Sequence, residues 1–233
     1  MRLEPTYLFH IASGSIAVLL YWATLLQRKG SERHKQNGRW FLAALVVVLT
    51  SIGGIFFLSR RGFSPPDIVQ FAYLSICLVT VASTAALAIR LKDDLRAFRG
   101  PWFKVMGIVT FAMALVVLAA GLATRNPMPV IFSVIGLVYG SAMIRFAFMQ
   151  SVAHPNWALI WHLNGMTFLF NAVHGTLLAV AWRTLIDPAA GAEVSMVTQI
   201  GTMLGALAMR IHFGRRFGAP LRLTAPRAAI ATA

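Results

Sequence analysis

The sequence predicts an all-α membrane protein, a bundle of seven transmembrane helices, because it is rich in long apolar runs and poor in charge. Hydrophobic residues make up 58% of the 233 residues and charged residues 12%, about half the share in a soluble domain. Seven runs have the roughly 20 apolar residues that cross a hydrocarbon layer, and none has an acidic residue in its interior. The predicted spans are Thr6–Gln27, Trp40–Ser59, Ile68–Leu91, Phe103–Thr124, Pro129–Gln150, Trp157–Trp182 and Val194–Phe213.

The basic residues predict the orientation of these spans. With the N-terminus outside, sixteen of the 21 lysines and arginines lie on the inner side and five on the outer side. Because Lys and Arg accumulate on the inner side of membranes, this distribution predicts an N-out/C-in topology. The formal charge of +14 then reflects topology, so we predict a lipid bilayer and not a nucleic acid as the partner.

The chain is predicted to hold one domain, a seven-helix unit of residues 1–213. Residues 214–233 are rich in Arg, Pro and Ala, and we expect a basic, disordered cytoplasmic tail there. The connections between spans are too short to hold a soluble catalytic domain. Small-residue spacings at Gly136-x3-Gly140 and Gly201-x3-Gly205 allow close helix packing, either within the chain or in a homo-oligomer.

Four histidines fall in the spans at two depths. His10 and His174 lie in the outer part, and His162 and His212 lie toward the inner side. A b-type haem takes one neutral imidazole from each of two helices at equal depth, so the pattern predicts haem ligands. His10 and His174 are the predicted outer iron ligands. His162 would pair with His212 or with a histidine from an inner loop. The alternative is that each imidazole hydrogen-bonds to a neighbouring helix.

The sixth span is the most polar. Asn164 and Asn171 are seven residues apart and share a helix face close to His174, while Met166 lies on another face with His162. Lipid offers amides no partner, so this stripe is expected to face the bundle interior. It predicts either the lining of a buried site or interhelical hydrogen bonds. Met166 is a candidate soft ligand or an ordinary core residue.

A pattern at the start of the chain adds to this interpretation. The first span carries His10-x3-Gly14, and Lys29-Gly30-x3-His34-x3-Gly38-Arg39 follows. This pattern resembles a family of small bacterial multi-span membrane proteins of unknown function, in which a later histidine is followed closely by methionine, as in His162 and Met166. The resemblance implies a bacterial inner (cytoplasmic) membrane and nominates His10, His34 and His162 as site residues, without implying an activity.

The segment that follows the first span also has a physical interpretation of its own. Arg33, His34, Lys35 and Arg39 are predicted to form a patch that attracts a phospholipid headgroup or an anionic redox protein. The alternative is an ordinary basic inner loop.

Three functions remain open from the sequence. The first is a membrane redox protein that uses haem b to move electrons between a quinol or a cytosolic donor and the outer face. The second is a transporter for a small solute or a metal; an ion-coupled carrier is disfavoured because all seven acidic residues lie in loops or at span ends. The third is a non-catalytic accessory subunit. A hydrolase is disfavoured, because the sequence has no serine, cysteine or carboxylate paired with a histidine at the same depth.

Overall fold

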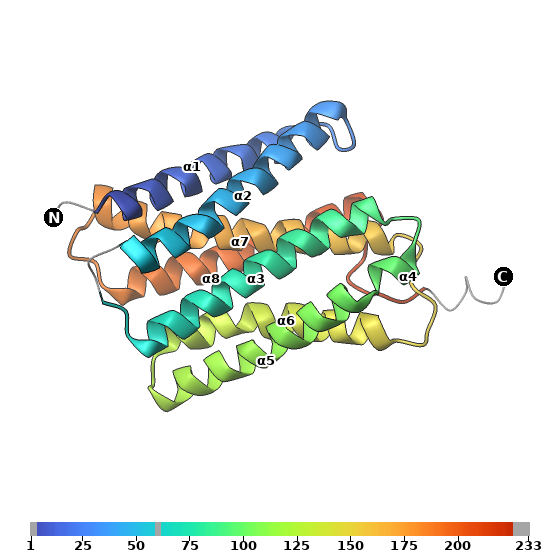
Figure 1. Ribbon diagram of the computed structural model, residues 1–233. Coiled ribbons are helices and arrows are strands. Elements are labelled where there is room, and N and C mark those ends of the chain that lie inside the picture. The colour runs from blue at the N-terminus through green and yellow to red at the C-terminus, as the bar shows by residue number, and fades with distance from the viewer. Residues whose placement is uncertain (1–3, 59–61, 226–233) are drawn as a thin grey trace.

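The structure is a computed structural model that describes residues 4–58 and 62–225. These residues form a bundle of long α-helices whose axes are roughly aligned (Figure 1). Seven of its helices are long and apolar enough to cross a membrane, so the predicted multi-pass fold is confirmed. The helices are α1 (Pro5–Leu26), α2 (Glu32–Leu58), α3 (Pro65–Arg90), α4 (Leu95–Phe98), α5 (Pro101–Ala123), α6 (Pro127–Phe148), α7 (Trp157–Leu185) and α8 (Ala192–Arg216).

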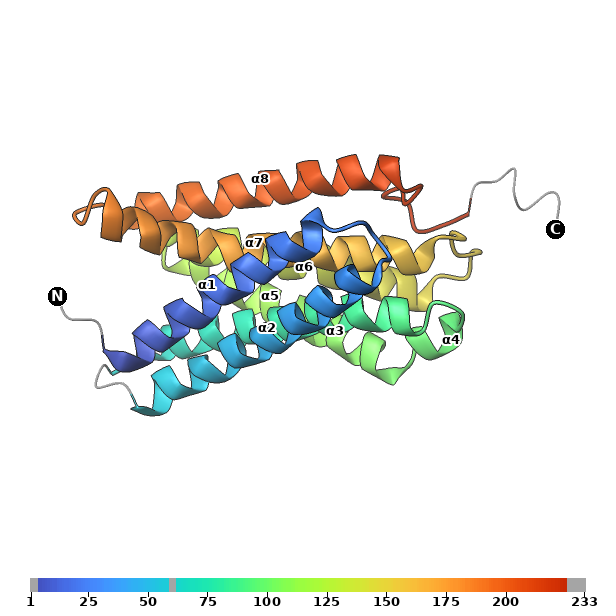
Figure 2. The same cartoon turned by 90° about the horizontal axis from the view of Figure 1, so that it is seen from above.

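Three antiparallel helix pairs make up most of the bundle, and contacts of α3 and α7 connect them. The pairs α1–α2, α5–α6 and α7–α8 pack along their lengths, and α3 packs on both α5 and α7. Figure 2 shows α8 along one side of the bundle with α7 beneath it. The short helix α4, the α1–α2 connection and the last turn of α8 lie at one end, which we call the α4 end (Figure 1).

The α4 end differs from expectation in two places. The segment 28–39, predicted as a loop, is helical from Glu32, so His34 lies in the first turn of α2. The predicted span begins at Trp40 because the residues before it are charged. A helix can continue beyond the hydrocarbon layer, and α2 does so. The second difference is α4 itself, one turn capped by Asp94, whose carboxylate accepts the Ala97 N–H at 2.8 Å.

Aromatic rings fill the core at the α4 end. Phe98 of α4 packs on Phe103 of α5 with ring centroids 4.7 Å apart. Trp161 of α7 is fully buried and lies 5.1 Å from Phe103 and 5.3 Å from Phe146 of α6. Edge and tilted contacts at these distances add to the burial of the rings. This cluster ties α4 to three spans and holds the α4–α5 connection in place.

The central α3–α7 contact depends on Gly165. A Cβ atom placed there would lie 2.5 Å from the Ala85 Cβ and 3.0 Å from the Val81 carbonyl oxygen. The missing side chain therefore lets the two helices approach, as small residues do in other membrane bundles. Gly136 and Gly140 likewise pack α6 against its neighbours, whereas Gly201 has no atom within 4 Å of its Cβ position. The homo-oligomer remains a prediction.

The segment after α8 is held against the bundle. Arg210 of α8 is 5% exposed, and its guanidinium donates to the carbonyls of Ala219 at 2.8 Å and Pro220 at 2.9 Å and to Asn164 Oδ1. A buried cation needs such acceptors when no carboxylate is present. The chain after Phe217 turns back to supply two of them.

A backbone bridge fixes the same segment further along. The His154 N–H donates to Leu223 O and the Ala225 N–H donates to Val152 O, both at 2.9 Å. Residues 214–225 are thus ordered, although the composition predicted disorder from residue 214. Residues 226–233 of that predicted tail lie outside the described residues.

Replacing Gly165 tests the α3–α7 contact. Gly165→Ala is expected to destabilise the protein by about 1–3 kcal/mol because α3 and α7 must separate to admit the methyl group. Gly201→Ala, the control in open space, should leave stability within about 1 kcal/mol of the parent. Thermal unfolding in detergent measures both, and equal midpoints for the two variants would contradict the close contact.

Replacing Arg210 tests the attachment of the segment after α8. Arg210→Met leaves three acceptors unpaired, at about 1–3 kcal/mol for each buried group, and should release this segment. Trypsin is then expected to cut after Arg222 faster than in the parent protein, measured by mass spectrometry of the fragments. Arg215→Met, a change of an exposed arginine on the same helix, is the control; the same cleavage rate in both variants would show that Arg210 does not hold the segment.

Candidate functional site

The residue pattern nominated one histidine in α2 and one in α7, and both lie toward the α4 end. His162 lies about one turn into α7, within electrostatic range of His34 and Lys29. His34 faces the bundle, whereas Arg33, Lys35 and Arg39 are exposed and Lys35 pairs with Glu32 at 2.7 Å. The predicted basic patch is therefore divided, with its histidine turned inward and its other cations outward.

The hydrogen bonds of His34 and His162 define which ring nitrogen carries the proton. His34 Nδ1 lies 3.0 Å from the Thr24 carbonyl oxygen of α1, and His162 Nδ1 lies 3.1 Å from the Ala85 carbonyl oxygen of α3. A carbonyl only accepts, so each Nδ1 carries a proton, and in the neutral form of each ring Nε2 is the atom with the lone pair. Neither Nε2 atom has a hydrogen-bond partner among residues 4–58 and 62–225.

Lys29 places a positive charge beside these rings. Its Nζ donates to the carbonyl of Leu25 and lies 5.8 Å from the ring centroid of Phe213 in α8. Burial, and after it the positive charge of Arg216, lower the pKa of Lys29. In the described part of the chain no carboxylate forms an ion pair with Lys29. The His34–His162 pair thus lies in a cationic setting without a counter-ion.

His212, the other predicted partner of His162, is exposed near the end of α8. Its ring contacts Phe213 at a centroid distance of 5.1 Å. No hydrogen bond joins it to His162 in the described residues. His34, a histidine of the segment that follows the first span, does interact electrostatically with His162, so the pairing of His162 with this histidine stays a prediction.

The predicted outer ligands, His10 and His174, have separate partners. His174 Nδ1 lies 2.8 Å from the Phe170 carbonyl, and its Nε2 accepts the Trp22 indole N–H at 2.8 Å. Both of its ring nitrogens are therefore occupied. Its ring contacts are with the aromatic side chains of Tyr21, Trp22 and Phe170, and none with His10 occurs among the described residues.

His10 is bonded to the neighbouring helix and lines a cavity. Its Nδ1 lies 2.6 Å from Ser51 Oγ, and that hydroxyl donates to the Val48 carbonyl. Because Ser51 has used its proton, His10 Nδ1 is the donor and Nε2 carries the lone pair. The cavity has a volume of about 210 Å³ and is mostly apolar, with His10, Asn171 and Gln199 among its polar lining residues.

The amides of the polar stripe bond to α8. Asn171 Nδ2 donates to Thr202 Oγ1 at 2.7 Å and to Gln199 Oε1 at 3.2 Å, while its Oδ1 is buried with no partner in the described chain. Asn164 Oδ1 accepts from Arg210. Met166 packs on the core through its side chain, and its carbonyl accepts the Tyr21 hydroxyl at 3.1 Å. The two amides therefore form interhelical hydrogen bonds, and Asn171 also lines the cavity.

Sequence reasoning missed three parts of these sites: Lys29, the cavity, and the Trp22–His174 bond. Lys29 stands in the Lys-Gly-x3-His pattern, so the spacing could have nominated it. Tryptophan is common at membrane interfaces, and no sequence pattern links Trp22 to His174. Within the described ranges no group of three or more His, Cys, Asp or Glu side chains could hold a metal ion.

Comparisons of the chain with protein-family models, with curated proteins and with solved structures found no match.

Proposed function

We propose that this protein is a membrane redox protein that holds a b-type haem between His34 and His162. The observation that carries the proposal is the state of the two imidazoles. Each gives its Nδ1–H to a backbone carbonyl and leaves the Nε2 lone pair without a partner among the described residues. Histidines that ligate metals commonly have this arrangement, in which the second hydrogen bond orients the ring.

The surroundings of the pair also suit haem. Thr24 O and Ala85 O belong to different spans, so the two rings are held from two sides of the bundle. Lys29 would neutralise a haem propionate, and Arg216, which acts on the charge of Lys29, stands on the same side. When bound, haem supplies one-electron transfer between ferric and ferrous iron. The backbone carbonyls would hold both rings in a fixed orientation, with Nδ1 as the protonated atom.

The outer histidines fit haem less well. His174 would have to give up the Trp22 hydrogen bond before its Nε2 could bind iron. The haem proposal therefore rests on the inner pair and not on His10 and His174. The bacterial inner membrane and the N-out/C-in orientation are part of the same proposal, supported by the sixteen basic residues on the predicted inner side.

The cavity beside His10 favours a quinol as the redox partner. A mostly apolar cavity suits a hydrophobic ring. His10 contributes an acceptor at Nε2, and the buried Asn171 Oδ1 is an acceptor with no partner in the described chain. Two acceptors match the two hydroxyl donors of a quinol better than the two carbonyls of a quinone.

The haem proposal predicts a spectrum that depends on two residues. Protein purified from haem-supplied cells should show a Soret band that shifts on dithionite reduction. His34→Ala and His162→Ala should each abolish most of it, because each removes one of the two imidazoles that would hold the haem, whereas His212→Ala, a change of an exposed histidine, should keep it. His34→Met should retain haem at a higher reduction potential, since thioether ligation favours ferrous iron. A colourless parent protein, or full haem in both alanine variants, would refute the assignment.

The quinol proposal predicts a binding defect that needs no haem. His10→Leu should weaken binding of a short-chain quinol to the purified protein by about tenfold, the loss of one hydrogen bond in an apolar site. Quenching of tryptophan fluorescence measures the affinity. His212→Leu makes the same change on the exposed face of α8 and should bind as the parent does. Equal affinities in the two variants would show that His10 takes no part in binding.

A further inference from the structure

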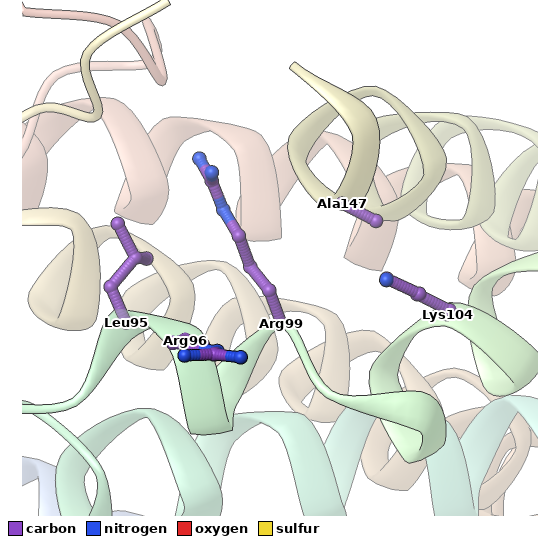
Figure 3. Close-up of a pocket in the computed structure, with 5 residues that line it drawn as sticks. All are labelled: Leu95, Arg96, Arg99, Lys104 and Ala147. Carbon is purple, nitrogen blue, oxygen red and sulfur yellow. The ribbon is translucent and has the colours of Figure 1, made fainter. Parts of the chain in front are cut away.

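We infer that the α4 end holds a second, separate binding site, a pocket for a phosphate group lined by Arg96, Arg99 and Lys104. The pocket has a volume of about 420 Å³, and Leu95 and Ala147 complete its lining. Figure 3 shows Arg99 and Lys104 extending from the α4–α5 segment, with Ala147 of α6 above Lys104. The haem proposal uses none of these residues.

The strongest evidence is the state of the Arg99 guanidinium. Its Nε and Nη2 atoms are buried and have no hydrogen-bond partner in the described chain. Buried donors on a charged group are costly when they stay unpaired, and this is uncommon in folded proteins. Arg99 also lines the pocket, so a shift of its side chain toward the pocket would let a bound anion accept from the planar guanidinium, a group whose geometry suits phosphate oxygens.

Two aromatic rings hold the charges in position. The Arg99 Cζ atom lies 4.3 Å from the ring centroid of Phe146, and the Lys104 Nζ atom lies 5.6 Å from that of Phe148. Both rings belong to the last turn of α6, and Phe146 is part of the aromatic core. Cation–π contacts restrain the side chains without neutralising them. Arg99 and Lys104 are therefore held in position without a ligand.

The pocket lacks any internal counter-ion. Its lining includes no acidic residue, and none of its three cations forms an ion pair with a carboxylate in the part of the chain that the structure describes. The nearest acidic residue along the chain, Asp94, accepts the Ala97 N–H as the cap of α4. Three positive charges without a counter-ion favour an anion, and the planar guanidinium of Arg99 favours phosphate oxygens over a simple halide.

The position of the pocket suggests where the phosphate comes from. Trp102 neighbours the pocket in sequence and is 47% exposed, as expected of a tryptophan at the level of lipid headgroups. A phosphate there can belong to an anionic phospholipid or to a free phosphate-bearing solute. Both present the same oxygens to Arg99, so the binding chemistry is shared.

The test compares variants in two arms. Arg99→Gln is expected to weaken binding of phosphatidylglycerol by about tenfold in a native mass-spectrometry titration of the delipidated protein, the loss of one charge-assisted interaction. Lys104→Gln should give a smaller loss of the same kind. Lys92→Gln removes one charge from the exposed turn between α3 and α4 outside the pocket and should stay within about twofold of the parent.

The second arm replaces the lipid with inorganic phosphate and measures the rise in the thermal midpoint. If the rise needs Arg99, the pocket also takes free phosphate; if only the lipid arm needs Arg99, the ligand is a headgroup. If Arg99→Gln does not fold, Lys104→Gln is compared with Lys92→Gln instead, because Lys104 lies in the first turn of α5. Equal losses in the Arg99, Lys104 and Lys92 variants in both arms would reduce the site to general surface charge and overturn the proposal.

Discussion

Polar groups inside this bundle have no water to bond to, and that constraint decides the state of its histidines. In an apolar surrounding every imidazole N–H must find an acceptor within the protein. His10, His34, His162 and His174 accordingly give the Nδ1–H to the chain, and the acceptors are Ser51, Thr24, Ala85 and Phe170. In the neutral form of these rings the lone pair is on Nε2. The partner of Nε2 distinguishes these histidines. His174 accepts the Trp22 N–H there and has a structural role, whereas the proposed functions use the Nε2 atoms of the other three.

A surplus of positive charge at the α4 end links the proposed haem and phosphate sites. The cations there are held by groups that carry no negative charge: Lys29 by a carbonyl, Arg210 by carbonyls and an amide, and Arg99 by an aromatic ring. Such contacts position a cation but leave its field intact. The haem propionates and the phosphate proposed here are anions, and this end of the molecule would attract both.

Hydropathy was enough to predict the spans, and it was not enough to predict the pairings. Depth follows from the position along a span, but the direction of a side chain around its helix depends on which neighbours the helix packs against. His10 and His174 have matching predicted depths and different partners for this reason. The charged neighbours of His34 led to its prediction as part of a surface patch. Successive residues of a helix point about 100° apart, so His34 faces inward while Arg33 and Lys35 are exposed. Its nomination came from the residue pattern alone.

Arg210 also ties the last span to the residues that follow it. The acceptors at Ala219 and Pro220 are synthesised after α8 itself. While those residues remain in the ribosome exit tunnel, the helix carries a cation whose carbonyl partners do not yet exist. The hydrogen bonds of Arg210 can therefore form only after residues 219 and 220 have been made, so the final packing of this end of α8 depends on the chain that follows it.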